Sequence, residues 1–325
     1  MENLNIFVPR LLESREYFSA GHRACQGCGE TISLRHILKA LGRNVIVVNA
    51  TGCSEIISSP LPQTAWHVPW IHVAFENAAA VASGVEAGLK AMMRKGYTPT
   101  RKICVMAVGG DGATADIGFQ ALSGAMERGH DMLYVCLDNE AYMNTGIQRS
   151  SSTPFGASTT TSPHGKLSIG QKTWKKNLPE IMVAHDIPYV ATACPSYPFD
   201  LVRKVKRAAA IEGPAYLHVL TVCPTGWRSA TDQTVLLGRM AAECGIFPVY
   251  EVENGRYTLN VDPGKLKPIK DYLRLQGRFR HLTDEDIAFI ERRVHEQFKR
   301  LSEKARLSSD ERTPAAKGKG SRGKI

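Results

Sequence analysis

Two short polar segments follow apolar stretches of this sequence, and the first of them suits an anion bound together with a divalent cation. Gly110-Asp111-Gly112 comes directly after the apolar run KICVMAVG. Glycine lets the backbone approach a phosphate group, and the start of a following helix favours negative charge. An aspartate there supplies a hard oxygen ligand for Mg²⁺, which commonly binds through few protein groups and the phosphates themselves. Alone, these three residues are equally well explained as a turn between a strand and a helix.

A second polar segment favours the ligand-binding interpretation. Asp138 and Asn139 lie 27 and 28 residues after Asp111, directly behind the next apolar run. One strand–helix–strand unit separates the two segments, so both are expected at the same edge of a parallel sheet, where ligands bind beyond the carboxyl ends of the strands. We therefore predict a site for a phosphate group and its magnesium ion at this edge. A β-turn residue is the alternative for Asn139.

The eight cysteines of the chain need a separate explanation. A disulfide framework does not fit a reducing compartment or a chain of this length, which leaves metal ligands and small buried side chains. Four thiolates suit either a structural zinc ion or a [4Fe–4S] cluster, and one CxxC with two distant cysteines is less typical of zinc. The cysteines expected in loops or at element ends, where side chains can converge, are Cys25, Cys28, Cys53 and Cys223. The cysteines expected as small buried side chains are Cys104, Cys136, Cys194 and Cys244.

The elements that must position these residues alternate between strand and helix. Uninterrupted apolar strands alternating with helices are typical of an α/β fold, a parallel sheet flanked by helices on both faces. The polar segment 143–180 has no apolar pattern, and a loop of that length in a compact domain is usually functional. Strands are predicted at 45–52, 102–112, 132–140, 188–193 and 215–223, and helices at 30–42, 76–94, 117–129, 178–185, 198–211 and 283–305.

Composition predicts a main binding domain with a C-terminal extension and flanking segments. The extension contains a predicted hairpin at Asn254-Gly255. The tail holds seven Lys and Arg against three Asp and Glu, so it supplies +4 of the net charge of +10. The expected parts are a leader at 1–23 that contacts a partner, a binding domain at 24–235, the extension at 236–301, and a basic tail at 302–325 that is disordered or lies on a partner.

The bulk properties exclude several classes of protein. No apolar run is long enough to span a membrane. The N-terminus carries acids and lacks the continuous apolar stretch of a secretory signal, so a cytoplasmic protein is expected. Because the positive charge lies in no recognition motif, we do not expect nucleic-acid binding.

Several segments together resemble one enzyme family. GHRACQGCGE, TGCSEI, GGDGATADIGFQALSGAMERGHD and DNEAYMNTGIQRSSSTPFGASTTTSPHGK look like the β subunit of pyruvate:ferredoxin oxidoreductase, over most of residues 20–230. The resemblance implies the thiamin-diphosphate-binding fold, with a [4Fe–4S] cluster next to the cofactor. It implies oxidative decarboxylation of pyruvate to acetyl-CoA, with coenzyme A as co-substrate and electrons passing through the cluster to ferredoxin. Oxalate, branched-chain 2-oxoacids and 2-oxoglutarate are alternative substrates.

The resemblance also implies roles for individual residues. It places the magnesium ligands at Asp111, Asn139 and the carbonyl of Ala141, and Glu30 and Asn144 near the reacting groups as catalytic residues. The remaining implied cofactor contacts are Gly110, Gly112, Tyr142, Thr145, Gly146 and Cys53, and the implied cluster ligands are Cys25, Cys28, Cys53 and Cys223.

The resemblance implies that other subunits complete the enzyme. These are a pyrimidine-binding α chain, a γ chain and a ferredoxin-like δ chain, and the glutamate that activates the pyrimidine is expected on one of them. Glu76 is the candidate within this chain, although its position at a helix start is the simpler explanation. Two other hypotheses remain open: a thiamin-dependent decarboxylase or carboligase without redox chemistry, and a zinc-stabilised nucleic-acid-binding protein that uses the basic tail.

Overall fold

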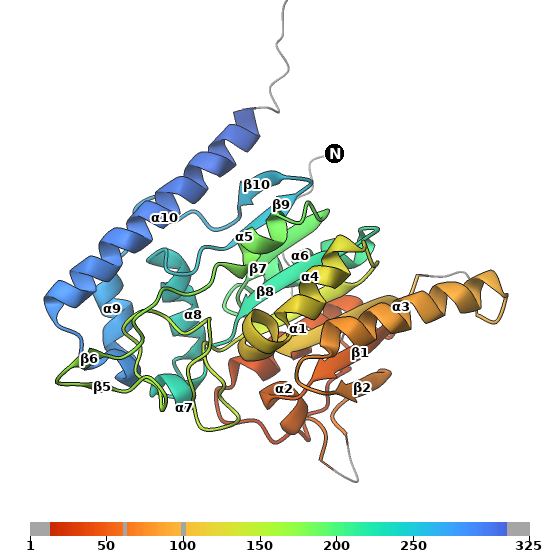
Figure 1. Cartoon of the computed structure of the whole chain (residues 1–325), viewed down its shortest axis with the longest axis horizontal. Helices are drawn as coiled ribbons and strands as arrows, with labels where there is room; N and C mark the ends of the chain where they lie inside the picture. Colours follow the sequence, from red (N-terminus) through yellow and green to blue (C-terminus); the bar gives the residue numbers. More distant parts are fainter. Residues whose placement is uncertain (1–13, 61–63, 99–101, 311–325) are drawn as a thin grey trace, which may run out of the picture.

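The computed structural model describes residues 14–60, 64–98 and 102–310. Within them, an eight-stranded sheet has the strand order β10-β9-β7-β8-β4-β3-β1-β2 (Figure 1). Neighbouring strands from β7 to β2 are parallel, whereas β9 and β10 are added antiparallel at the other end. The predicted parallel α/β sheet is thus confirmed. Its strands are β1 Val45–Ala50, β2 Trp70–Val73, β3 Cys104–Gly110, β4 Leu133–Asp138, β7 Tyr189–Ala193, β8 Ala215–Leu220, β9 Tyr250–Glu253 and β10 Arg256–Leu259.

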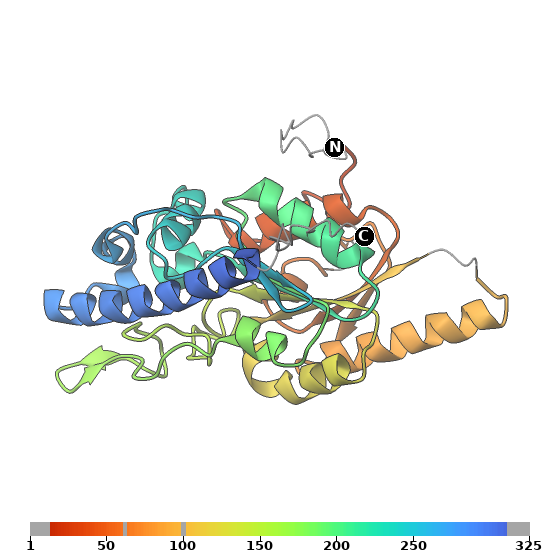
Figure 2. The same cartoon turned by 90° about the horizontal axis from the view of Figure 1, so that it is seen from above.

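Helices cover both faces of this sheet (Figure 2). Alternate residues of the strands enter two different apolar cores, one under α1 and α6 and the other under α3, α4 and α5. A third apolar cluster joins α8, α9 and α10. The helices are α1 Gly29–Leu41, α2 Cys53–Ile56, α3 Ala78–Arg94, α4 Phe119–Glu127, α5 Leu178–Val183, α6 Pro198–Ala210, α7 Pro224–Trp227, α8 Thr234–Glu243, α9 Ile269–Arg274 and α10 Asp284–Asp310.

Helix α1 shows how local sequence sets an element that later positions the site. Its apolar residues Leu34, Ile37 and Leu38 recur at helical spacing, and all three are fully buried. Burial of each such side chain stabilises the fold by roughly 1.5–3 kcal/mol. Gly42 ends the helix, as its position in the sequence predicted. Its φ is 67°, and its N–H donates to the Leu38 carbonyl at 2.8 Å.

The predicted helix 117–129 is confirmed as α4 Phe119–Glu127. A π-helical turn, η2 Ala113–Ile117, follows β3 and precedes α4. The Gly118 N–H closes the turn by donating to the Ala113 carbonyl at 2.9 Å, and a Cβ on Gly118 would lie 2.2 Å from that oxygen. Such turns inside helices are frequent at functional sites. Here the turn directly follows Asp111.

The long polar loop is irregular as expected, except for one short hairpin. This hairpin pairs β5 His164–Gly165 with β6 Ser168–Ile169. Edge strand β2 was not predicted, because half of its residues are exposed and its run of apolar residues is short.

The C-terminal residues modify the expected division of the chain. The hairpin at Asn254-Gly255 forms, with both residues at positive φ, and its strands extend the main sheet beside β7. Helix α10 continues to Asp310, so residues 302–310, which composition assigned to a disordered tail, are helical. The Tyr257 N–H donates to the Ser308 hydroxyl at 3.1 Å, which attaches this last part of the helix to β10. Residues 311–325 lie outside the described part of the chain.

The described part of the leader contacts its own chain. Tyr17 and Phe18 are buried, and Phe18 forms a β-bridge with Trp66. The expected partner contact of residues 1–13 falls outside the described residues. Among the helices that the structure describes, none combines the length and apolar character needed to cross a membrane.

Candidate cofactor-binding site

The two polar segments meet at the carboxyl edge of the sheet. β3 pairs with β4 so that Gly110 lies opposite Leu137, and Asp111 and Asn139 therefore follow neighbouring strand ends. Both are buried, and the Asp111 carboxylate accepts a hydrogen bond from the Ser150 hydroxyl. Burial raises the pKa of Asp111 well above its usual range, and the nearby Asp138 charge adds to the rise. A cation bound at this carboxylate would relieve both effects.

The glycines beside Asp111 serve different purposes. A Cβ on Gly112 would lie 2.2 Å from the ring of Tyr142, whose hydroxyl donates to Asp116 at 2.9 Å. At Gly110, the atom nearest to such a Cβ among the described residues is the Leu137 carbonyl oxygen, at 4.0 Å. Packing of Tyr142 therefore requires Gly112, whereas the space beside Gly110 remains open to a ligand.

Asn139 connects this edge to the CxxC segment. Its amide donates to the Glu30 carboxylate at 2.6 Å, and its side-chain oxygen accepts from the Ala141 N–H at 3.4 Å. Glu30 is buried, and burial raises its pKa to about 7 although the bond from Asn139 opposes the rise. Glu30 therefore lies directly behind the predicted magnesium ligands.

The CxxC loop is held against the segment that ends in Cys223 by hydrogen bonds. The Gly29 N–H donates to the Val222 carbonyl at 3.0 Å, and the Thr234 hydroxyl donates to the Gly27 carbonyl at 2.5 Å. A Cβ on Gly29 would lie 2.7 Å from the Val222 nitrogen, so glycine is required for this approach. The CxxC loop thus lies against the segment that ends in Cys223.

Electrostatics indicate that the four thiols share one neighbourhood. Burial raises the pKa of Cys53 above its usual range, and nearby Glu30 and the thiolates of Cys223, Cys28 and Cys25 raise it further. Burial likewise raises the pKa of Cys28 to about 12 and that of Cys223 to about 11. Raised pKa values make these thiols weak nucleophiles, which argues against free redox thiols, and a bound metal cation would lower the same pKa values. Of the other four cysteines, Cys104 is partly exposed and the rest are buried as expected.

The segment from Tyr142 to Gly146 forms a tight turn at the mouth of this edge. The Tyr142 N–H donates to the Gln148 carbonyl at 3.0 Å, and Gly146 has a φ of 92°. The Thr145 hydroxyl donates to the Gln148 side chain at 2.8 Å. Asn144 is exposed at the tip of the turn, which leaves its amide accessible to a small molecule.

Sequence reasoning missed the cations and the histidine that surround this edge. Lys175 and His218 both contact the Asp138 carboxylate, and Lys175 also donates to Glu140 at 2.9 Å. Burial alone would raise the pKa of Asp138, but Lys175 and His218 outweigh it and lower the pKa to about 2. Lys175 and His218 lie 37 and 80 residues from Asp138 along the chain, and Arg278, which contacts Glu140, lies 138 residues from it. No local sequence pattern signals partners at such separations.

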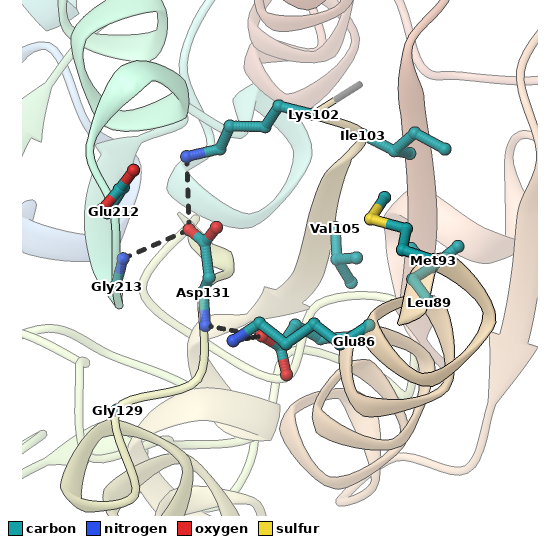
Figure 3. Close-up of a pocket in the computed structure, with 11 residues that line it drawn as sticks. Glu86, Leu89, Met93, Lys102, Ile103, Val105, Gly129, Asp131, Glu212 and Gly213 are labelled. Carbon is teal, nitrogen blue, oxygen red and sulfur yellow. Dashed lines mark hydrogen bonds and ion pairs between the residues drawn. The ribbon is translucent and has the colours of Figure 1, made fainter. Parts of the chain in front are cut away.

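A pocket of about 420 Å³ lies at the opposite, amino edge of the same strands (Figure 3). Asp131 accepts hydrogen bonds from Lys102 and from the Gly213 N–H, both at 3.3 Å, and its own N–H donates to Glu86 at 3.3 Å. Glu86 also pairs with Lys90 and His130. Asp131, Glu86 and Lys102 are thus paired within the chain, and we do not assign this edge the cofactor.

Comparison with known proteins identifies the family. Residues 50–219 match the family model described as "Thiamine pyrophosphate enzyme, C-terminal TPP binding domain". Subunit PorB of pyruvate synthase from Methanocaldococcus jannaschii is 59% identical over 287 residues, which cover 88% of this chain and 96% of that protein. The chain belongs to this family of thiamine pyrophosphate enzymes.

Other relatives in the family carry a second name. Subunit VorB of ketoisovalerate oxidoreductase from Pyrococcus abyssi is 50% identical over 300 residues, which cover 91% of this chain and 96% of that protein. Among solved structures, a chain of 2-oxoglutarate:ferredoxin oxidoreductase from Magnetococcus marinus is similar in fold, with a TM-score of 0.54 and 23% identity over 70% of this chain and 82% of that one. The chain is therefore a subunit of a 2-oxoacid oxidoreductase that binds thiamine pyrophosphate.

The carboxyl edge fits thiamin diphosphate with a divalent cation. Asp111 is a buried acid that makes no hydrogen bond or ion pair with a cationic side chain in the described part of the chain. The buried hydroxyls of Ser152 and Thr221, on the segments beside it, likewise have no hydrogen-bond partner there. A buried carboxylate without a cationic partner, with hydroxyls free beside it, provides the hard oxygen ligands that a magnesium–phosphate group requires.

The four thiols suit an iron–sulfur cluster in their chemistry and in their shared surroundings. Within the described residues, however, no three side chains of the Cys, His, Asp and Glu types converge into a finished metal site. The ligand set is therefore taken up as a proposal below.

Proposed function

We propose that this chain binds thiamin diphosphate, Mg²⁺ and a [4Fe–4S] cluster, and that its enzyme oxidatively decarboxylates pyruvate to acetyl-CoA and CO₂. The observation that carries the proposal is the 2.6 Å hydrogen bond from Asn139 to Glu30. It joins the phosphate-binding edge directly to the segment of the CxxC cysteines. A group that reacts at this edge therefore lies beside a group able to accept its electrons.

The magnesium ligands in this proposal are the Asp111 carboxylate, the Asn139 side-chain oxygen and the Ala141 carbonyl. The open space beside Gly110 admits the diphosphate, and Tyr142, Thr145 and Gly146 form the adjoining wall. Thiamin diphosphate, when bound, supplies the carbanion chemistry that decarboxylation requires.

The catalytic roles fall to Glu30 and Asn144. Glu30 has a pKa near neutrality, so its carboxyl can hold a proton while one oxygen accepts the Asn139 hydrogen bond. Asn144 is exposed at the turn and is placed to orient the carboxylate or carbonyl of a 2-oxoacid.

The cluster ligands in this proposal are Cys25, Cys28, Cys53 and Cys223. Hydrogen bonds hold the CxxC loop against the segment that ends in Cys223, and the nearby thiolates raise the pKa of Cys53. Each thiol would lose its proton on binding iron. Electrons pass from the cluster to ferredoxin, and coenzyme A accepts the acyl group. Pyrimidine-binding α, γ and ferredoxin-like δ chains complete the complex, which we place in the cytoplasm.

The test is anaerobic purification of the complex with its co-expressed partner chains. Iron, sulfide and thiamin would be measured, followed by dye reduction with pyruvate, oxalate, 2-oxoglutarate and a branched-chain 2-oxoacid. We expect all three components, and CoA-dependent reduction with pyruvate. A complex that lacks both iron and affinity for thiamin diphosphate would overturn the proposal.

A branched-chain 2-oxoacid is the second candidate substrate. The 50% identity to the Pyrococcus abyssi subunit of ketoisovalerate oxidoreductase favours it, against 59% for the pyruvate synthase subunit. Faster reduction with the branched substrate than with pyruvate would decide for this candidate.

A further inference from the structure

We propose that Lys175 and Arg278 are positioning residues that hold the loop 138–141 in its magnesium-binding conformation. The inference rests on the proposed function, because this loop carries two of the three proposed ligands. The loop contains a backbone conformation that its sequence does not favour. Glu140 has a φ of 71°, and such a conformation costs a non-glycine residue about 1–3 kcal/mol unless its surroundings impose it.

The contacts of Glu140 impose that conformation from several directions. One carboxylate oxygen accepts from Lys175 at 2.9 Å, and the other accepts from Arg278 at 2.5 Å. Its carbonyl accepts from the Thr153 hydroxyl at 2.8 Å, and its N–H donates to Asp138 at 3.0 Å. Side chain and backbone are both held, so the φ of Glu140 and the direction of the following Ala141 carbonyl are determined together.

The acids of the loop 138–141 form ion pairs that do not involve Asp111. Asp138 and Glu140 are buried acids; the partly exposed Lys175 contacts both, and the buried Arg278 pairs with Glu140. Two negative charges thus meet two positive charges. Asp111 has no such partner among the described residues, which leaves its carboxylate for the metal ion.

Arg278 also connects the loop to the segment that carries Cys223. Its guanidinium lies 4.0 Å from the ring centre of Trp227, and the Trp227 indole donates to the Asn139 carbonyl at 2.9 Å. Arg278 belongs to the 3₁₀ turn η3 Gly277–Phe279, in the C-terminal extension. The extension therefore contacts the proposed metal loop from a position far away in the sequence.

Loss of either cation removes one of the two ion pairs of Glu140 and leaves the two buried acids beside a single lysine or arginine. The loop can then relax from the positive φ, which turns the Ala141 carbonyl away from the metal. Outer residues that orient metal ligands typically contribute about 10–100-fold to metal affinity. We expect a loss of that size for Lys175→Met and for Arg278→Met, with partial recovery in Lys175→Arg.

The experiment measures Mg²⁺ affinity in the complex purified with its partner chains. The metal is removed with a chelator, and Mg²⁺ is titrated at fixed thiamin diphosphate while cofactor binding is followed by calorimetry. Lys304→Met is the matched control, because Lys304 pairs with Glu180 away from the loop, and its affinity should stay within about twofold of wild type. Iron content, measured in parallel, reports whether the fold is intact.

A double variant separates positioning from general stability. In Arg278→Met/Glu140→Gly the carboxylate that has lost its arginine is absent, and glycine adopts the positive φ without strain. We expect its Mg²⁺ affinity to recover most of the loss seen in Arg278→Met, whereas a merely structural role predicts a further decrease. Wild-type affinity in both single methionine variants would overturn the inference. Failure of the wild-type complex itself to bind Mg²⁺ and thiamin diphosphate would instead overturn the proposed function.

Discussion

The amino and carboxyl edges of the central strands carry Asp131 and Asp111, but of these two only Asp131 is paired with a cation in the described part of the chain. At the amino edge, Asp131 is paired with Lys102 and with the backbone N–H of Gly213 (Figure 3). At the carboxyl edge, Asp111 is buried with one hydroxyl partner, Ser150. An acid that is paired in the chain contributes to the fold, whereas a buried acid without a cation is prepared for a ligand. The comparison predicts opposite responses to the same kinds of substitution.

The largest expected effect is the loss of the cluster in Cys53→Ser. Because all four thiolates are proposed as ligands, this chain should lose its iron and sulfide, so the complex should lose the equivalent of one [4Fe–4S] cluster, and pyruvate-dependent dye reduction should disappear. The matched control is Cys104→Ala, at the start of β3 on the amino edge, which should keep its iron. Full iron content in Cys53→Ser would remove Cys53 from the ligand set.

Asp111→Asn should weaken the binding of Mg²⁺ and at the same time stabilise the apoprotein. The variant keeps the shape of the side chain and removes its charge, so we expect Mg²⁺ affinity to fall by more than about 100-fold. The apoprotein should become more stable, because a buried acid without a cation is no longer present. Titration calorimetry and urea unfolding without metal would measure the two effects. A destabilised apoprotein would contradict the view that Asp111 is unpaired.

Asp131→Asn is the counterpart at the amino edge. It removes the ion pair with Lys102, which is partly exposed, so the loss of stability should be about 0.5–1 kcal/mol. Urea unfolding would measure this loss, and Mg²⁺ affinity should not change. If the variant bound Mg²⁺ or thiamin diphosphate markedly more weakly, the two edges would be coupled and the comparison would fail.

The smallest expected effect concerns an exposed ion pair remote from both edges. The hydrogen bond from Arg35 lowers the pKa of Glu16 to about 2, with burial opposing and Lys39 assisting the shift. Because the folded-state pKa is lowered, this contribution is complete above pH 4.5 and is lost as the pH falls toward 2. Glu16→Gln should therefore cost less than about 1 kcal/mol at pH 7, where solvent screens the pair, and nothing near pH 2. Urea unfolding across this range gives the difference, and a cost that grows on acidification would contradict it.

The sequence determined the parts of the molecule that depend on local patterns. Apolar runs and helical spacing predicted the parallel sheet, α1 with its end at Gly42, and the hairpin at Asn254-Gly255. One strand–helix–strand unit was enough to predict that Asp111 and Asn139 follow neighbouring strand ends, because parallel strands present their carboxyl ends at one edge.

Only the tertiary structure decided how the charges of the site are balanced. Lys175 comes from a loop without periodicity, and Arg278 comes from the C-terminal extension, so neither position carries a local signal. The positive φ of Glu140 and the continuation of the last helix from its predicted end at 305 to Asp310 were also absent from the sequence analysis. The physical reason is the same for all of them: each depends on partners far away in the chain, and such contacts exist only once the fold has brought them together.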